Sequence, residues 1–320
     1  MPTLHPPNPT RVQNTTPRVD RNGNVIDCHN GCLRYFDDAF YLYGTSYSDT
    51  NRLTPANRCV AYRSENLATW EPLGEVLEAP LDGVGHRPQV VYNAYSGLFV
   101  LWFTWIPAGG VEQLGVATAG QPVGPFEVIN PDVRVARPNP GNHSLFVDHD
   151  GQGYLIYTSI RGEDRGPYAG SHGISVEKLM PDFTASTLCN GGIFSADVEA
   201  PAMFIFEDRY YCIFGKTCNF DSAGTSAEVY RSGGPLGPWK KLTDINRNRH
   251  GELVVAARQT DITALPGRVE PLLVWIADRW GSAPDGIKGH DLQHWEPLSF
   301  DDAGHPQPLR DLDTWDYALP

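Results

Sequence analysis

The sequence lacks any run of about 18 consecutive apolar residues, the length that a transmembrane helix needs. Its first 20 residues also lack the apolar core of a signal peptide. We therefore expect no association with a membrane, and either a cytoplasmic location or a secretion signal that this sequence does not contain. Helical periodicity is missing along the chain as well, which argues against an α-helical fold.

Positive charge is also scarce. The chain has 25 Lys and Arg residues against 38 Asp and Glu residues, giving a net charge of -13 and an isoelectric point near 5.1. Nucleic-acid-binding proteins usually carry a basic patch or stripe, so we expect no nucleic-acid partner. An acidic surface favours solubility and neutral or cationic ligands. It carries no signal for association, and we expect a monomer.

The six cysteines are too irregularly spaced in a chain of this length to form a disulfide scaffold. Cys28, His29 and Cys32 resemble half of a zinc site, but no second pair follows at ligand spacing. We therefore expect small buried residues, a pattern that is compatible with one or two disulfides. We assign no metal ligand. The cysteines are Cys28, Cys32, Cys59, Cys189, Cys212 and Cys218.

Short aromatic-rich runs alternate with turn signals along the whole chain, a pattern that favours an all-β fold. Among them are FYLYGTS at 40–46, LFVLWFTW at 98–105 and YYCIFGKT at 210–217. The 32 glycines and 27 prolines suit many turns, but they form no tract long enough for a linker. We therefore expect one domain over residues 1–320, with about 1–20 as an N-terminal arm.

A second element recurs at a fixed period: a turn, an aromatic residue and then a short outer strand. Neighbouring aromatic residues of this set are 56 or 57 positions apart. This period is typical of a propeller or a solenoid, and a solenoid would need caps on its exposed edge strands. Five such units cover nearly the whole chain, so we predict a five-bladed β-propeller whose aromatic rings pack between blades. The residues are Trp70, Phe126, Phe183, Trp239 and Trp295.

The innermost strand of each propeller blade lines the central channel, so residues at equivalent strand starts should converge near the axis. Aligning the blades on the aromatic residue of the second strand selects five polar residues, each before a strongly apolar strand. Strand starts are often polar because they are solvated, but five polar residues out of five favour a functional constellation. The five residues are His29, His86, Asn142, Glu199 and Gln259.

Several neighbours of these positions are further candidates for substrate binding. Arg87 could orient a carboxylate or be a surface cation. Trp280 could offer an apolar platform to a sugar face or pack in the core. His143 would take the place of Asn142 if the alignment slipped by one residue. Arg279 completes this set.

Glu199 is the only carboxylate among the five aligned residues. Apolar strands around it would desolvate it and raise its pKa, which suits a general acid that protonates a leaving oxygen. Glycoside hydrolysis normally uses two carboxylates, and the second is not obvious here. Asp27 is the nearest candidate, because it lies two residues before His29 and strand alternation places both on one face.

The sequence resembles glycoside hydrolase family 43, a family of five-bladed propellers, and within it most closely the branch of exo-β-1,3-galactanases. The resemblance runs from about Asp20 to Phe300 and rests most specifically on VEAPAMF and ADRWG, with support from HRPQVVYNAYSGLFVLW and RQTDI. It implies an exo-acting, inverting hydrolase of galactan, arabinogalactan or arabinose-containing side chains. It also implies a secreted or extracellular location and no cofactor for the chemistry, and it is compatible with a structural calcium ion in the channel.

The resemblance also assigns roles to individual residues. Glu199 matches the general acid of the family, and Gln259 matches a glutamine that this branch uses where most members have an aspartate base. His29 matches a histidine of the first-blade motif, here CHNGC. His86 stands where the branch has Glu, and Asn142 stands where the family has Asp.

These two departures leave other functions open. One alternative is a sugar-binding propeller that no longer hydrolyses its ligand. Another is a lyase or a metal-assisted enzyme that uses His29 and His86, because neutral imidazoles are good bases and metal ligands.

Overall fold

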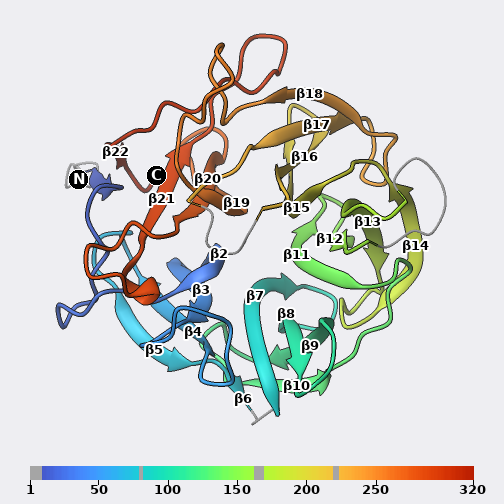
Figure 1. Ribbon diagram of the computed structural model, residues 1–320, viewed down its shortest axis with the longest axis horizontal. Coiled ribbons are helices and arrows are strands. Elements are labelled where there is room, and N and C mark those ends of the chain that lie inside the picture. Colours follow the sequence, from blue (N-terminus) through green and yellow to red (C-terminus); the bar gives the residue numbers. More distant parts are fainter. Residues whose placement is uncertain (1–8, 79–81, 162–168, 219–222) are drawn as a thin grey trace, which may run out of the picture.

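The computed structural model describes residues 9–78, 82–161, 169–218 and 223–320, which form a ring of five antiparallel blades (Figure 1). This arrangement confirms the predicted all-β, five-bladed propeller. Helical structure in the described ranges is limited to one short 3-10 turn, η1 (Lys288–His290). No helix of these ranges is long and apolar enough to cross a membrane.

Each blade runs from the axis outward in chain order. Blade 1 consists of β2 (His29–Phe36), β3 (Ala39–Ser46), β4 (Arg58–Ser64) and β5 (Glu71–Glu75). Blade 2 consists of β7 (Gly83–Asn93), β8 (Leu98–Pro107), β9 (Gln113–Ala119) and β10 (Phe126–Asn130), with β6 (Leu77–Glu78) parallel to β10. Blade 3 consists of β11 (Pro140–Val147), β12 (Gly153–Ser159), β13 (Gly173–Leu179) and β14 (Ser186–Ile193).

The last two blades differ in size. Blade 4 has the strands β15 (Val198–Phe206), β16 (Arg209–Lys216), β17 (Glu228–Ser232) and β18 (Lys240–Asp244). Blade 5 has three strands in the described residues, β19 (Arg258–Leu265), β20 (Leu272–Arg279) and β21 (Leu292–Pro297). The inner strands of neighbouring blades contact each other around the ring, so the starts of β2, β7, β11, β15 and β19 converge.

The hydrophobic core consists of five clusters, one at each interface between neighbouring blades. The second strands are apolar on both faces because a blade on either side covers them; all seven residues of β12 are buried, for example. This double burial explains why the second strands stand out in the sequence as continuous aromatic and aliphatic runs.

The repeated aromatic residues pack at these interfaces, as the period predicts. Trp70 and Trp295 meet edge to face between blades 1 and 5, with their ring centroids 5.9 Å apart. Trp295 lies in β21, the outermost strand of blade 5 as predicted, although this blade has three strands in the described ranges where the others have at least four. The reason is that the chain between Trp280 and Leu292 forms turns and η1 instead of a strand.

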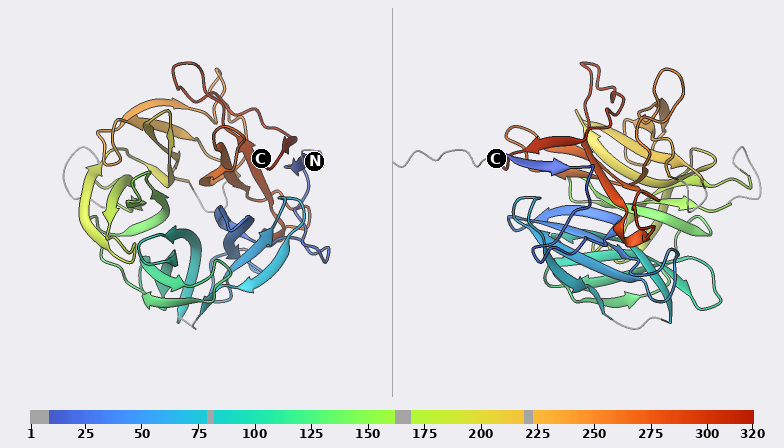
Figure 2. Two further views of the ribbon diagram at one scale, coloured as in Figure 1. Left: turned by 180° about the vertical axis from the view of Figure 1, so that it is seen from behind. Right: turned by 60° about the vertical axis from the view of Figure 1, so that its left-hand side comes forward.

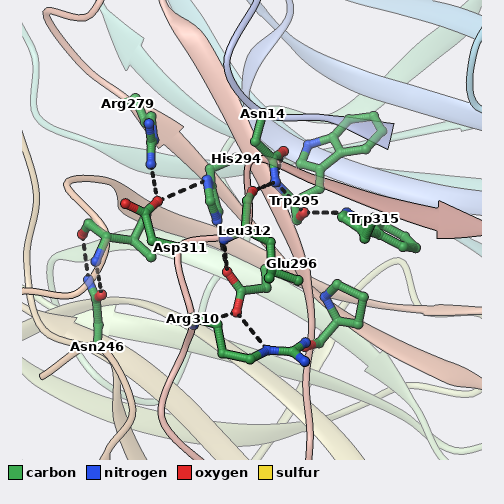
Figure 3. Close-up of polar contacts among 12 residues, drawn as sticks. Asn14, Asn246, Arg279, His294, Trp295, Glu296, Arg310, Asp311, Leu312 and Trp315 are labelled. Carbon is green, nitrogen blue, oxygen red and sulfur yellow. Dashed lines mark hydrogen bonds and ion pairs between the residues drawn. The ribbon is translucent and has the colours of Figure 1, made fainter. Parts of the chain in front are cut away.

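The two ends of the chain close the ring beside blade 5 (Figure 2). The N-terminal β1 (Thr10–Gln13) pairs antiparallel with the C-terminal β22 (Thr314–Tyr317). Asn14 fixes this pair to blade 5: its Nδ2 donates to Trp295 O at 2.9 Å and to Leu312 O at 2.8 Å (Figure 3). The second half of the predicted arm is therefore part of the fold, whereas residues 1–8 lie outside the described ranges.

All six cysteines lie in the described ranges, and none of them forms a disulfide. Four are buried, as expected for small core residues; Cys189 is exposed and Cys218 is partly buried. The one or two disulfides that the sequence allowed are therefore not formed.

Candidate active site

Every inner strand has a β-bulge at the equivalent place near its start. In four blades the pairing with the second strand shifts directly after the residue predicted for the site, and in β11 the shift spans Asn142. Bulges turn side chains to new directions and are common beside active sites. In three blades the residue that follows takes a left-handed backbone conformation: Asn30, Arg87 and Ala200.

The bulged strand ends surround a cavity of about 240 Å³ at one end of the channel. Four of the five aligned residues line this cavity: His86, Asn142, Glu199 and Gln259. The alignment therefore brings together residues from blades 2, 3, 4 and 5. From the inner strand of blade 1 the lining residue is Asn30, the neighbour of the predicted His29.

His29 lies behind the cavity wall and is 1% exposed. Its Nδ1 is 3.0 Å from Asp278 Oδ1, and its Nε2 is 3.2 Å from the carbonyl oxygen of Gly289. Burial lowers the pKa of His29, but the Asp278 carboxylate opposes this and the net pKa is raised. Asp278 Oδ2 also accepts a hydrogen bond from the Asn30 amide at 2.7 Å, so this pair supports the bulge that presents Asn30.

Arg87 forms the floor of the cavity. It is 1% exposed, so the alternative of a surface cation is wrong. Its guanidinium donates to Asn30 Oδ1, to His143 O at 2.9 Å and to Thr260 O at 3.0 Å, which connects blades 1, 3 and 5. Burial lowers the pKa of Arg87 to about 10, so the side chain stays charged at neutral pH. The cavity therefore ends at Arg87 and does not continue as an open channel.

Further along the inner strands, Arg34 of β2 and Asp261 of β19 form a buried ion pair. Arg34 also donates to Val90 O at 3.0 Å and to Gln89 Oε1 at 3.2 Å. No group of three or more His, Cys, Asp or Glu side chains in the described ranges could hold a metal ion. The structural calcium ion that the resemblance allowed, with water as most of its ligands, stays a prediction.

Glu199 enters the cavity from blade 4 and forms an ion pair with Arg258, with 2.5 Å between Arg258 Nη2 and Glu199 Oε1. Cys218 Sγ lies 3.7 Å from the same oxygen. The second oxygen, Oε2, has no hydrogen bond within the described residues. The purely apolar surroundings expected for Glu199 are therefore not present. Sequence reasoning missed Arg258, although it opens the RQTDI segment next to Gln259.

Gln259 lines the cavity, but its amide group is fully engaged with the protein. Its Nε2 donates to Ala200 O at 2.9 Å and to Ile213 O at 2.8 Å, and its Oε1 accepts from Trp275 Nε1 at 3.0 Å. Both amide hydrogens are used. Gln259 thus connects blade 4 to blade 5, and it has no donor left to hold a water molecule.

Asp27 lies away from the cavity. Its carboxylate accepts hydrogen bonds from Ser46 Oγ at 2.6 Å, Tyr47 N at 2.9 Å and Ser48 N at 2.7 Å. These contacts fix the end of β3. The expected alternation of side chains does not place Asp27 on the cavity side, because β2 begins only at His29 and has a bulge directly after it.

His143 and Arg279 also lie outside the cavity lining. His143 is fully buried, where burial and the Arg87 charge lower its pKa to about 3, so its imidazole is neutral. Arg279 pairs with Asp311 at the outer side of blade 5, in the network that holds the C-terminal segment (Figure 3). Trp280, by contrast, does line the cavity. Its ring centroid lies 5.2 Å from that of His29, and Lys288 Nζ lies over the Trp280 ring, 3.9 Å from its centroid.

His86 and Glu112 form the blade 2 side of the cavity. His86 is 2% exposed, and neither of its ring nitrogens has a hydrogen-bond partner in the described part of the chain. Glu112, directly before β9, places Oε1 3.7 Å from His86 Nε2 and keeps 30% of its side chain exposed. Sequence reasoning missed Glu112, because it lies in a connection between strands and has no equivalent in the repeat.

No family model matches the sequence, and neither does any curated protein. Solved structures do match over nearly the whole chain. A GH43 β-1,3-galactosidase has a TM-score of 0.80 and 21% identity, covering 96% of this chain and 64% of its own length. A second GH43 β-1,3-galactosidase, solved with galactodeoxynojirimycin, has a TM-score of 0.79 and 22% identity, covering 95% and 99%.

An exo-β-1,3-galactanase from Clostridium thermocellum is similar as well, with a TM-score of 0.78 and 24% identity over 95% of this chain and 66% of its own. The chain thus spans just under two thirds of the length of two of these three proteins. At such identities the likeness shows the fold. The resemblance to glycoside hydrolase family 43 that the sequence predicted is confirmed at that level.

Proposed function

We propose that the protein is an exo-acting glycoside hydrolase that removes a terminal sugar from a galactan-type chain, with Glu199 as the general acid. One observation carries this proposal: Glu199 lines a cavity at the convergence of the inner strands, and its Oε2 has no hydrogen-bond partner among the described residues. The solved structures with the same fold support it, because they are structures of β-1,3-galactosidases and exo-β-1,3-galactanases.

The shape of the cavity supports exo action. Arg87 lines the cavity and bonds to the inner strands of blades 3 and 5, so a polysaccharide cannot pass through the ring, and a chain end fits such a cavity. The volume of about 240 Å³ is below the roughly 300–1,000 Å³ of pockets for drug-sized ligands, and it suits a single sugar unit. Asn30 and Asn142 offer amide groups for sugar hydroxyls, and Trp280 offers an apolar surface.

The contacts of Glu199 suggest how it would act as an acid. Arg258 and Cys218 both contact Oε1, so the transferable proton belongs on Oε2, which has no hydrogen-bond partner among the described residues. This proton would pass to the glycosidic oxygen as the bond between that oxygen and C1 breaks. In the inverting reaction that we propose, a water molecule attacks C1 from the opposite side.

The substrate and the location are also part of this proposal. The first substrates to examine are β-1,3-linked galactans, because the similar structures are a β-1,3-galactosidase and an exo-β-1,3-galactanase, followed by arabinogalactan and arabinose-containing side chains. Such polysaccharides lie outside cells, so we propose that the protein acts there. The alternative of a metal-assisted or lyase reaction through His29 and His86 is less favoured, because His29 is buried behind the cavity wall.

Product analysis of wild type and Glu199→Gln tests the proposal. Both proteins are incubated with β-1,3-galactan and with galactose, arabinofuranose, xylose and uronic-acid oligosaccharides. We expect release of a monosaccharide by the wild type and a loss of about 10²–10⁴-fold in kcat for the variant. Glu207→Gln, an exposed substitution at the other end of β15, is the matched control and should retain full activity.

Two results would contradict the proposal. Saturable binding of a sugar without any release would identify a non-hydrolytic sugar-binding protein. Equal activity of wild type and Glu199→Gln would remove Glu199 from the chemistry.

A further inference from the structure

The described lining of the cavity contains one carboxylate besides Glu199, and it is Glu112. Glu112 reaches the cavity from blade 2 and Glu199 reaches it from blade 4, with Asn142 of blade 3 between them in ring order. The two carboxylates therefore enter from blades that are not neighbours. Inverting glycosidases hold two carboxyl groups on opposite sides of the sugar, with room for a water molecule between one of them and C1.

The surroundings of Glu112 fix its place at the cavity. A Cβ atom at position 141 would lie 3.2 Å from Glu112 Oε2, so the carboxylate packs closely against Gly141 at the start of β11. Its other oxygen faces the His86 ring. From the connection before β9, Glu112 therefore contacts the inner strands of two blades, β7 at His86 and β11 at Gly141.

His86 gives an independent indication of a ligand. Its ring is buried, lines the cavity and leaves both nitrogens without a partner in the described ranges. Buried polar groups of native proteins are nearly always hydrogen-bonded, so such a side chain points to a ligand or a water molecule at this place. The 3.7 Å between His86 Nε2 and Glu112 Oε1 is too long for a hydrogen bond, and both groups remain available to one shared oxygen atom.

The residues that the sequence offered as partners of Glu199 do not fill this role. The amide hydrogens of Gln259 are used by Ala200 O and Ile213 O, and the Asp27 carboxylate is used by the turn after β3. Glu112 remains the carboxylate of the described cavity that can take a proton.

We propose that Glu112 is the general base of the hydrolysis and that His86 holds the same attacking water molecule. This inference rests on the proposed function and names a second catalytic residue for it. Glu112 takes one proton from the water as the water oxygen bonds to C1. The bond between C1 and the glycosidic oxygen breaks, and that oxygen takes the proton of Glu199. The step consumes one water molecule and needs no other reactant.

The experiment compares Glu112→Ala and Glu112→Gln with the wild type, with and without sodium azide. Azide needs no deprotonation, so it can replace a water molecule that has lost its base. We expect kcat to fall by about 10²–10⁴-fold in both variants, with a much smaller change in KM. Azide should restore turnover in Glu112→Ala and give a glycosyl azide with inverted anomeric configuration, detected by nuclear magnetic resonance.

Glu127→Gln, exposed on the outer strand β10 of the same blade, is the matched control and should match the wild type with and without azide. Thermal unfolding checks that each variant is folded, and the isosteric Glu112→Gln preserves the packing against Gly141. Full activity of Glu112→Ala beside an inactive Glu199→Gln would overturn this inference alone. A rise in KM without azide rescue would also overturn it, because Glu112 would then bind a sugar hydroxyl. Absence of hydrolysis by the wild type would overturn both proposals.

Discussion

Arg258 and Glu199 form an ion pair in the cavity wall, and each side chain is 13% exposed. The two residues belong to neighbouring blades, Arg258 at the start of β19 and Glu199 near the start of β15. The pair therefore fixes the orientation of the Glu199 carboxyl group relative to blade 5, with Oε1 against the guanidinium and Oε2 without a hydrogen-bond partner among the described residues.

Arg258→Lys should lower kcat by about 10²-fold. The flexible lysine side chain lacks the planar guanidinium that orients a carboxylate, so the Glu199 carboxyl group can turn away from its productive position. KM should change much less. Steady-state kinetics on the sugar that the wild type releases measure both constants. Arg249→Lys, exposed in the connection after β18, is the control. An unchanged kcat with a lower melting temperature would show that Arg258 only stabilises the fold.

Gln259→Met should destabilise the protein by about 2–4 kcal/mol, because it leaves two carbonyl oxygens and the Trp275 N–H without their partners in a buried place. Urea unfolding followed by tryptophan fluorescence measures the change. A role limited to holding a catalytic water molecule would predict the opposite pattern, with unchanged stability and a lost kcat.

The period of the aromatic residues was sufficient to predict the fold, because each blade must pack a large ring against its neighbour. The same alignment placed His86, Asn142, Glu199 and Gln259 at one cavity. It failed by one residue in blade 1, where Asn30 lines the cavity and His29 is held behind the wall by Asp278 and the Gly289 carbonyl oxygen. These two partners come from blade 5, and the periodicity of the sequence does not describe contacts between blades.

Residues outside the repeat could not be found in this way. Glu112 lies in the connection between β8 and β9, where the blades differ in length and sequence. Its carboxylate packs against Gly141, about 30 positions away in a different blade. Gln259 was located correctly, but its hydrogen bonds to the backbone of blade 4 depend on the packing of two blades, which the periodicity does not describe.

The His29–Asp278 pair predicts a pH dependence of stability. Burial lowers the pKa of His29, but the contact with Asp278 raises it and the net shift is upward. The folded-state pKa therefore lies above the unfolded value of about 6.5. The pair therefore adds stability below that pH, and this stability is lost as the pH rises through the folded-state pKa. The difference in free energy of unfolding between wild type and His29→Gln should be largest at low pH.

Urea unfolding of both proteins between pH about 5 and 9 measures this difference. His149→Gln, an exposed substitution in blade 3, is the control and should show no such trend. A difference between wild type and His29→Gln that stays constant with pH would mean that His29 does not change its charge in this range.

Asn14→Ala tests how the chain ends close the propeller. The side chain of Asn14 is 1% exposed and makes four hydrogen bonds: two with Trp295, one to Leu312 O and one from Arg18 Nη2. Their loss leaves buried backbone groups unsatisfied, so we expect a loss of about 2–4 kcal/mol in the free energy of unfolding.

Asn14→Asp separates the parts of this effect, because it keeps the acceptor for Trp295 N and loses only the donors. Its loss of stability should therefore differ from that of Asn14→Ala, and urea unfolding compares the two. The cavity is lined by other parts of the chain, so kcat at a temperature where the variants are folded should equal that of the wild type. Reduced kcat in a fully folded Asn14→Ala protein would show that ring closure also sets the geometry of the cavity.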